Sequence, residues 1–205
     1  MMKNLILLFS IITLISGISE EVSAQTKNSP TGGQLGQEHY WYDGTTKRSI
    51  RINPNRIADF TPTAASQVKA SGILPNGKVI SPRNGGARIW EVPAIVAKNG
   101  IIQPVTIPRG DFSQIFHDGN SAENRMRALP GGVIVYLDPS WGPHQVSGWA
   151  NKNGFFILKK LEINPNVFLI KSPPGIDSLL LANVLVEGGE VKYAIPNWWT
   201  PVSKR

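Results

Sequence analysis

Three histidines are the side chains of this sequence with the most direct potential for metal binding or acid–base chemistry. They stand at His39, His117 and His144, and the chain contains no cysteine. Zinc sites usually combine histidines and cysteines with short, defined spacings, and these three histidines are far apart. The sequence therefore predicts no metal site and no cofactor.

A second candidate chemistry is the grouping of His117, Asp118 and Ser121, whose residue types are those of a hydrolase triad. Triad members normally come from separate parts of a chain, so neighbours in sequence rarely form one. No nucleophile elbow and no Gly-rich phosphate loop is present elsewhere. We interpret the grouping as part of a polar loop and predict that the chain is not an enzyme.

Tryptophans offer a third possibility, a platform for a sugar or another ligand. Trp141, Trp149, Trp198 and Trp199 fall on predicted helix faces and at strand ends, where aromatic side chains usually pack into the core. Trp198 and Trp199 are the pair for which packing is least certain. An exported binding module that uses them, or an open sheet face, is therefore the alternative hypothesis.

The charge of the chain is basic, with a formal net charge of +7. Its lysines and arginines are scattered, and the predicted strands carry no aromatic RNA-binding signature. These features argue against a nucleic-acid partner. They indicate a solvated basic surface that favours an acidic partner.

The elements that must position any site are clearest between Gly131 and Trp199. The order of predicted elements there is strand, helix, strand, strand, helix, strand, which is the ferredoxin-like arrangement. We therefore expect an α+β protein with a ferredoxin-like βαββαβ domain at 130–199. The predicted strands are 133–137, 155–161, 167–171 and 191–195, and the predicted helices run from Pro143 to Asn153 and from Pro173-Pro174-Gly175 to Gly188-Gly189.

These four strands are apolar on both faces, whereas two helices in this topology cover only one face. A large apolar patch is seldom left in water, so the second face needs another domain or a partner. We favour a docking face that contains aromatic side chains, because such residues dominate protein contacts. The residues of that predicted face are Ile134, Tyr136, Phe168 and Ile170.

The first 24 residues have the pattern of a secretory signal peptide, with Lys3, an apolar stretch from about Leu5 to Ile15, and Val22-Ser23-Ala24 as the cleavage site. The apolar stretch is too short for a membrane span. We expect a periplasmic or secreted protein with no membrane contact after cleavage. Cleavage removes Lys3, Glu20 and Glu21, a net charge of −1, so the mature chain has a net charge of +8.

The middle of the chain predicts a small β-rich unit at 38–108, preceded by a flexible leader at 25–37. The polar segment 109–129 predicts a linker or a long surface loop. Within the unit, Asp43-Gly44, Asn53-Pro54-Asn55 and Asn99-Gly100 predict turns, 87–92 predicts a strand, and 64–70 predicts a short helix.

Three motifs in the last third of the chain carry a family resemblance. They are the strand after Pro130-Gly131-Gly132, Pro173-Pro174-Gly175 before a helix that contains Ala182-Asn183, and the closing Val191-Lys192-Tyr193-Ala194-Ile195-Pro196-Asn197. Through these motifs Gly131–Trp199 resembles the inhibitory prodomain of subtilisin-like and kexin-like serine proteases, whose closing motif is Val-x-Tyr-Ala-x-Pro-Asn. Tyr40–Phe60 is similar, more weakly, to the β segment that precedes some bacterial prodomains.

The resemblance implies a protein without a protease domain, since nothing after Trp199 matches the family's catalytic motifs. It implies a stand-alone prodomain that acts in trans as an inhibitor or folding chaperone of a subtilisin-like or kexin-like protease. Ile195 and Asn197 stand where family members often have acidic residues that cap helices of the protease. Asn197 can still accept N–H bonds at a helix N-terminus, so it joins the predicted docking residues, whereas Ile195 cannot.

The predicted C-terminal tail is 200–205. Pro201 cannot extend a strand ladder, so we expect Val202, Ser203, Lys204 and Arg205 to leave the last strand in extended form. In the resembling family this segment occupies the active-site cleft like a cleaved product. The resemblance implies Arg205 in the primary pocket, Lys204 beside it and Val202 in the fourth subsite, with Ser203 in the primary pocket as the alternative.

Overall fold

The computed structural model describes residues 36–62, 76–93, 95–96, 102–103, 107, 110–120 and 125–202. The described elements all belong to the compact unit that spans Thr31–Arg205. In these residues the chain is an α+β structure with two helices and antiparallel sheets. Several predictions fall outside the described residues: the signal peptide at 1–24, the leader up to residue 35, the helix at 64–70, the Asn99-Gly100 turn, Ser121, and the tail residues Ser203, Lys204 and Arg205.

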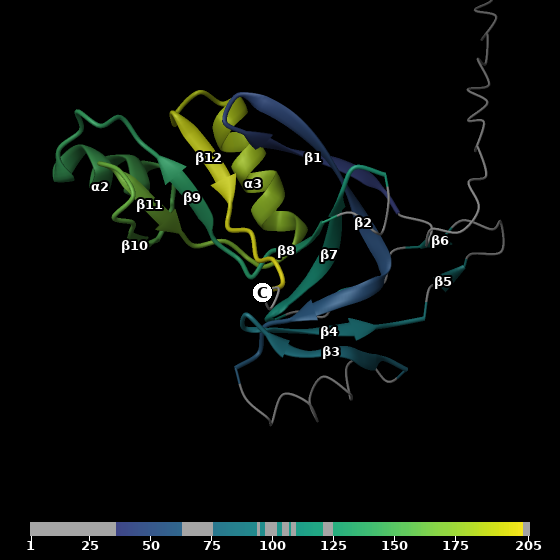
Figure 1. Cartoon of the computed structure of the whole chain (residues 1–205). Helices are drawn as coiled ribbons and strands as arrows, with labels where there is room; N and C mark the ends of the chain where they lie inside the picture. Colours follow the sequence, from purple (N-terminus) through teal and green to yellow (C-terminus); the bar gives the residue numbers. More distant parts are fainter. Residues whose placement is uncertain are drawn as a thin grey trace, which may run out of the picture. The chain divides into compact units, whose positions relative to one another are not determined.

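A six-stranded antiparallel sheet is built from strands that precede Leu129 (Figure 1). Its order is β3-β4-β2-β7-β8, and β1 pairs with the first half of β2 outside this path. A separate antiparallel pair is formed by β5 (Ile95–Val96) and β6 (Ile102–Gln103), which lie on either side of the turn predicted at Asn99-Gly100. The strands of the six-stranded sheet are β1 (Glu38–Asp43), β2 (Thr46–Asp59), β3 (Lys78–Asn84), β4 (Ala87–Glu91), β7 (Phe112–Asp118) and β8 (Met126–Ala128).

The turn predicted at Asn53-Pro54-Asn55 is wrong, because β2 continues through it. The pairing with β7 shifts between Asn53 and Ile57, which makes this segment a bulge. Pro54 lacks an N–H, and a bulge is a place where no ladder bond is required. The Asn53 side chain accepts the Asn55 N–H at 3.0 Å and so takes over a local backbone bond. The hairpin turn predicted at Asp43-Gly44 is confirmed, with Asp43 paired to Thr46.

The linker or loop predicted at 109–129 is also wrong, because this segment holds β7 and β8. β7 lies between β2 and β8, and Ile115 and Phe116 are fully buried. Its polar residues misled the prediction because their partners are far away in sequence. The buried Ser113 hydroxyl, for example, accepts the Leu129 N–H at 3.0 Å.

A four-stranded antiparallel sheet and both helices follow Leu129, at the places that the sequence predicts. The order of its strands is β10-β11-β9-β12. Helix α2 has Pro143 in its first turn, and its N-terminal Gly142 N–H donates to the Gln145 side chain at 2.8 Å. The elements are β9 (Val133–Tyr136), α2 (Pro143–Lys152), β10 (Ile157–Lys160), β11 (Val167–Ile170), α3 (Ile176–Glu187) and β12 (Tyr193–Pro196).

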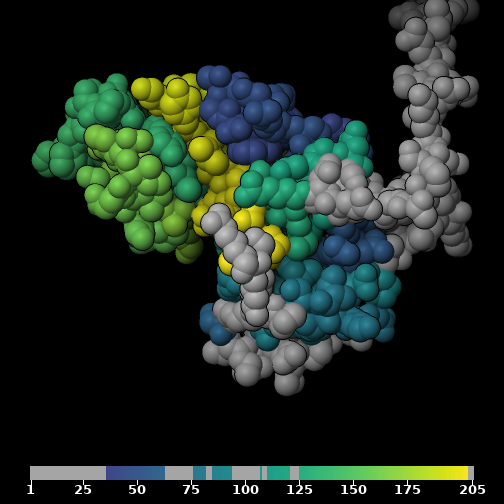
Figure 2. Space-filling model, in the orientation of Figure 1, coloured from purple at the N-terminus to yellow at the C-terminus, as the bar shows by residue number. Residues whose placement is uncertain are grey.

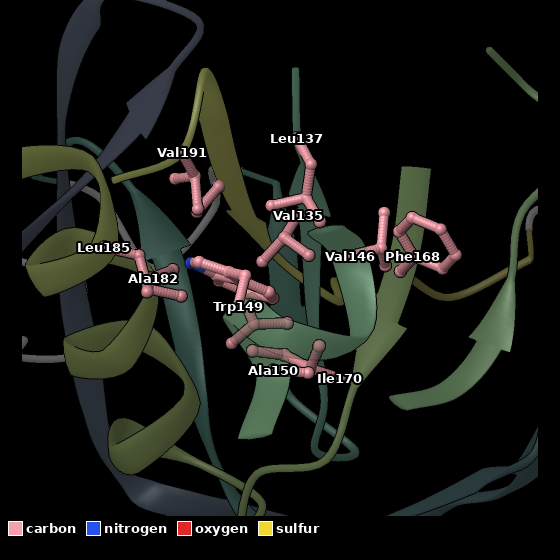
Figure 3. Packing of buried hydrophobic residues seen from close by; sticks show 12 residues of the cluster. Val135, Leu137, Val146, Trp149, Ala150, Phe168, Ile170, Ala182, Leu185 and Val191 are labelled. Carbon is pink, nitrogen blue, oxygen red and sulfur yellow. The ribbon is translucent and has the colours of Figure 1, made fainter. Parts of the chain in front are cut away.

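The helices pack on one face of this four-stranded sheet. Trp149 of α2 lies among Ala182 and Leu185 of α3 and Val135 of β9 (Figure 3). Ala182 and Leu185 make up only part of the apolar surface of α3. None of the helices in the described ranges has the length and apolar character needed to cross a membrane.

The six-stranded sheet covers a further part of the apolar surface of α3, whereas Leu180 and Val184 stay 50% and 63% exposed. Leu179 is fully buried in a cluster with Trp41 and Phe116. Asn183 donates its side-chain N–H to the Tyr40 carbonyl at 2.9 Å. Hydroxyls of two β1 tyrosines both donate to Glu187, at 2.9 and 3.0 Å, and these bonds raise the pKa of Tyr40 and of Tyr42. Helix α3 is thus held between the two sheets.

Candidate docking face

Backbone pairing determines which side chains share a face of the four-stranded sheet. Tyr136 is paired with Val167 and Tyr193, and Ile134 is paired with Leu169 and Ile195. Directly paired residues point to the same face, and successive residues alternate. The neighbours Val133 and Val135 lie in the core under the helices. Ile134 and Tyr136 therefore belong to the face away from the helices, as predicted.

The assignment of Phe168 and Ile170 to the same face is wrong. Phe168 is paired with Val135 and Ile170 with Val133, so both point toward the helices. Their side chains are 9% and 0% exposed and belong to the core. The sequence alternates apolar residues on both faces of β11, so only the register with β9 distinguishes them.

β10 (Ile157–Lys160) and the residue before it carry the most exposed apolar side chains of the sheet. Phe155 and Ile157 pack toward the core, so Phe156 points the other way. Leu158 is the extra residue of the bulge between Ile157, which is paired with Ile170, and Lys159, which is paired with Leu169. Phe156 is 66% exposed and Leu158 is 50% exposed. We call the face away from the helices the open face. Val167 on it is fully buried, and its apolar residues are Ile134, Tyr136, Phe156, Leu158, Val167, Leu169, Tyr193 and Ile195.

The edge of the open face at β12 is bordered by the β1–β2 hairpin. Asp43, Gly44 and Thr45 at its tip line a hollow of about 440 Å³ together with Tyr136 and Tyr193. The two tyrosine rings meet edge to face with centroids 6.0 Å apart. On the same strand, Ile195 packs against the cluster around Trp41. The six-stranded sheet therefore covers the β12 side of the open face and leaves the β10 side uncovered.

Asn197, the remaining predicted docking residue, is used inside the chain. Its side-chain N–H donates to the Gly131 carbonyl at 3.0 Å, and its backbone N–H donates to Gly132. These bonds hold the chain after β12 close to the start of β9.

Both tryptophans after β12 pack against the six-stranded sheet. The Trp198 ring meets Trp41 at 5.6 Å and Phe116 at 5.7 Å between centroids. Trp199 is directed to a different cluster, where its ring meets Phe60 at 6.0 Å. The two rings thus serve packing and do not form one platform.

Trp199 also fixes the backbone beyond β12. Its N–H and carbonyl exchange bonds with Ala128 of β8 at 2.8 and 3.0 Å, and its indole N–H donates to the Gly85 carbonyl at 2.8 Å. A Cβ at Gly85, where φ is +59°, would lie 3.1 Å from the indole nitrogen and 3.2 Å from Val202. Val202 of the predicted tail is 60% exposed beside this turn.

The side chains with potential for chemistry are placed apart from one another. His117 is 1% exposed on β7, with its Nε2 3.2 Å from the Asn53 amide nitrogen. Asp118 forms an ion pair with Arg127 at 2.9 Å. His144 is exposed in the first turn of α2, and burial lowers the pKa of the half-buried His39. Within the described residues, no three His, Cys, Asp or Glu side chains are grouped to hold a metal.

Sequence reasoning missed Phe156, Leu158, Leu169, Tyr193 and Ile195 as members of the open face. The alternation from Phe155 to Leu158 shows two apolar faces but does not say which one is covered. The bulge between Ile157 and Lys159 adds a change of register that no local pattern signals.

Comparison with known proteins adds nothing to this geometry. No protein-family model, no curated protein and no solved structure matches the chain.

Proposed function

We propose that this chain is an exported, stand-alone prodomain-like protein that binds a subtilisin-like or kexin-like serine protease in trans. It acts as an inhibitor, a folding chaperone or both, in the periplasm or outside the cell, and it catalyses no reaction itself. The observation that carries the proposal is the open face, an apolar sheet surface with helices only on its other side.

The fold proposed for residues 130–199 is the ferredoxin-like domain of such prodomains. The element order from β9 to β12, with sheet order β10-β11-β9-β12, supports this proposal. We propose that the strands between residues 38 and 128 form one N-terminal unit, which extends the predicted 38–108 because β7 and β8 belong to the same sheet as β1 to β4. In this proposal the N-terminal unit supports β12 and the segment after it.

The free energy available for docking can be estimated from the apolar side chains that are exposed on the open face. Phe156 and Leu158 keep half or more of their surface in water. Full burial of such a side chain contributes about 1.5–3 kcal/mol, so covering the exposed part of each contributes about 1–2 kcal/mol. Ile134, Tyr136 and Leu169 are half-buried beside them and extend the contact. A flat protease surface against β10, β11 and β9 would cover all of these side chains.

The tail adds a second contact. Docking through the open face raises the effective concentration of the residues after Trp199 near the active site. Val202, Ser203, Lys204 and Arg205 are the residues proposed to enter the substrate cleft. The guanidinium of Arg205 suits an acidic primary pocket, as in a dibasic-cleaving enzyme.

The proposal is tested with the mature chain, Gln25–Arg205, and two purified probes, a subtilisin and a kexin-type protease. We expect inhibition of at least one protease, or a higher yield when that protease is refolded from denaturant. Deleting Lys204 and Arg205 should weaken inhibition of the dibasic-cleaving protease about tenfold, or about 1.4 kcal/mol. A full-length chain that neither inhibits nor assists refolding of either protease would refute the proposal.

A further inference from the structure

The open face has two unlike halves. On the β12 side, the hairpin tip borders Tyr193, and Ile195 packs against the N-terminal unit. On the β10 side, no other described element is paired with the outer edge of the strand. Figure 2 shows the same arrangement, with the light-green β10–β11 segment and the blue β1–β2 segment on opposite sides of the yellow β12.

Two lysines flank the exposed apolar side chains on this β10 half. Lys159 is paired with Leu169, so it points to the open face. The Lys171 N–H donates to the Phe156 carbonyl at 2.8 Å, which places Lys171 opposite Phe156 on the neighbouring strand. Both lysines are exposed.

Lys159 and Lys171 form no ion pair with the residues that the structure describes. From Phe155 to Lys171 the sequence has three lysines and a single acidic residue, Glu162. The β10 half is therefore an apolar patch with a positive border.

We infer that the β10 half of the open face recognises a partner surface that is apolar at its centre and bordered by carboxylates. This inference rests on the proposed function for the identity of the partner, a protease. Phe156 and Leu158 form the apolar centre of the contact. Lys159 and Lys171 face acidic side chains of the partner, speed up association and set the orientation of the bound sheet.

We assign these roles because like charges that face each other at the rim of a contact weaken binding. Burying the two apolar side chains against a partner brings the lysines to the rim of the contact, where a basic partner would be repelled. Rim charges act mainly on the association rate and lose their effect as salt is added. The same lysines would also oppose pairing of two copies of this chain through β10, because like charges would meet there.

The first experiment measures the surface itself, independently of any protease. The probes are 8-anilinonaphthalene-1-sulfonate, which is apolar and anionic, and Nile red, which is apolar and neutral. The variants of the mature chain are Phe156→Ser, the double variant Lys159→Glu/Lys171→Glu, and Lys78→Glu on β3 as a control for the type of charge change. All four positions are exposed, so the circular dichroism spectra should be unchanged.

The expected result separates the apolar and the charged contribution. Phe156→Ser should weaken binding of both dyes. The double lysine variant should weaken the anionic dye about tenfold, leave Nile red unchanged, and lose this effect at high salt. Lys78→Glu should change neither dye by more than about twofold. The inference would be overturned if Lys159→Glu/Lys171→Glu and Lys78→Glu weakened binding of the anionic dye equally. It would also be overturned if Phe156→Ser changed the binding of neither dye.

The second experiment separates this inference from the proposed function. For a protease that the wild-type chain inhibits, the double lysine variant should associate about tenfold more slowly at low salt, whereas Lys78→Glu should not. An unchanged association rate would overturn the inference while the proposed function stands. If the chain neither inhibits nor assists refolding of either protease but the dyes respond as expected, the proposed function fails and the chemistry of the surface stands.

Discussion

Trp199 connects the segment after β12 to the six-stranded sheet, and we expect its replacement to destabilise the chain. Its indole N–H donates to the Gly85 carbonyl at 2.8 Å, and its ring packs with Phe60 in a cluster that includes Ala128. Trp199→Phe removes the indole N–H and leaves the Gly85 carbonyl without this donor, which should cost about 1 kcal/mol. Trp199→Ala also loses the apolar contact of a half-buried ring, about 100 Å² and 2.5 kcal/mol, for a total of about 3.5 kcal/mol.

The assay for Trp199 is urea unfolding of the mature chain, followed by circular dichroism at constant pH. The backbone bonds between Trp199 and Ala128 use main-chain atoms, so both variants can retain them. The order of stability should be wild type, Trp199→Phe, Trp199→Ala. If Trp199→Ala costs less than about 1 kcal/mol, the ring does not hold this segment and the reasoning fails.

Three further predictions follow from burial and charge. Phe168→Ala should destabilise the chain by about 3 kcal/mol in urea unfolding, whereas Leu158→Ala should cost less than about 1 kcal/mol; equal costs would contradict the assignment of faces. Arg88→Met should cost about 3 kcal/mol, because it leaves the buried Asp59 carboxylate without the guanidinium 3.3 Å away; a neutral effect would show that this pair is not buried in solution. Burial lowers the pKa of His39 in the folded chain, so on acidification this imidazole is protonated in the unfolded chain before it is protonated in the folded chain. The free energy of unfolding should therefore fall as the pH drops below about 6.5. His39→Gln should make unfolding midpoints less dependent on pH between 7 and 5, and an unchanged pH profile would exclude His39 as the cause.

Local sequence patterns were sufficient to predict the helices and strands after Leu129. Pro143 suits the first turn of α2, and Gly188-Gly189 follows the last residue of α3. The apolar runs around them have the length and composition of buried strands. These features act within a few residues of each other, so the sequence alone could predict the elements.

Long-range contacts decided the features that sequence reasoning got wrong. β7 is rich in polar residues, and it can be buried because Ser113 bonds to Leu129, directly after β8, and His117 to Asn53 of β2. The open face could not be assigned because β11 is apolar on both sides. Only the pairing of Phe168 with Val135 shows that Phe168 lies under the helices. Register is a relation between strands, and no local pattern contains it.

The packing of helix α3 also depends on residues that are distant in sequence. The sequence predicts where this helix lies but not which surfaces it packs against. The structure places Leu179 against the six-stranded sheet, where Asn183 and Glu187 also bind β1. Two packing surfaces account for apolar residues on more than one side of α3, and Leu180 and Val184 stay exposed.

The most direct test of the central claim, that the open face docks a protease, compares two surfaces of the same domain. The variants are Tyr136→Asp/Leu158→Asp on the open face and His144→Asp on the exposed side of α2. With the circular dichroism spectra unchanged, the open-face variant should raise the inhibition constant for the protease at least about tenfold, or 1.4 kcal/mol. His144→Asp should leave it unchanged. An inhibition constant that is unaffected by the open-face variant, or equally affected by both, would contradict the account.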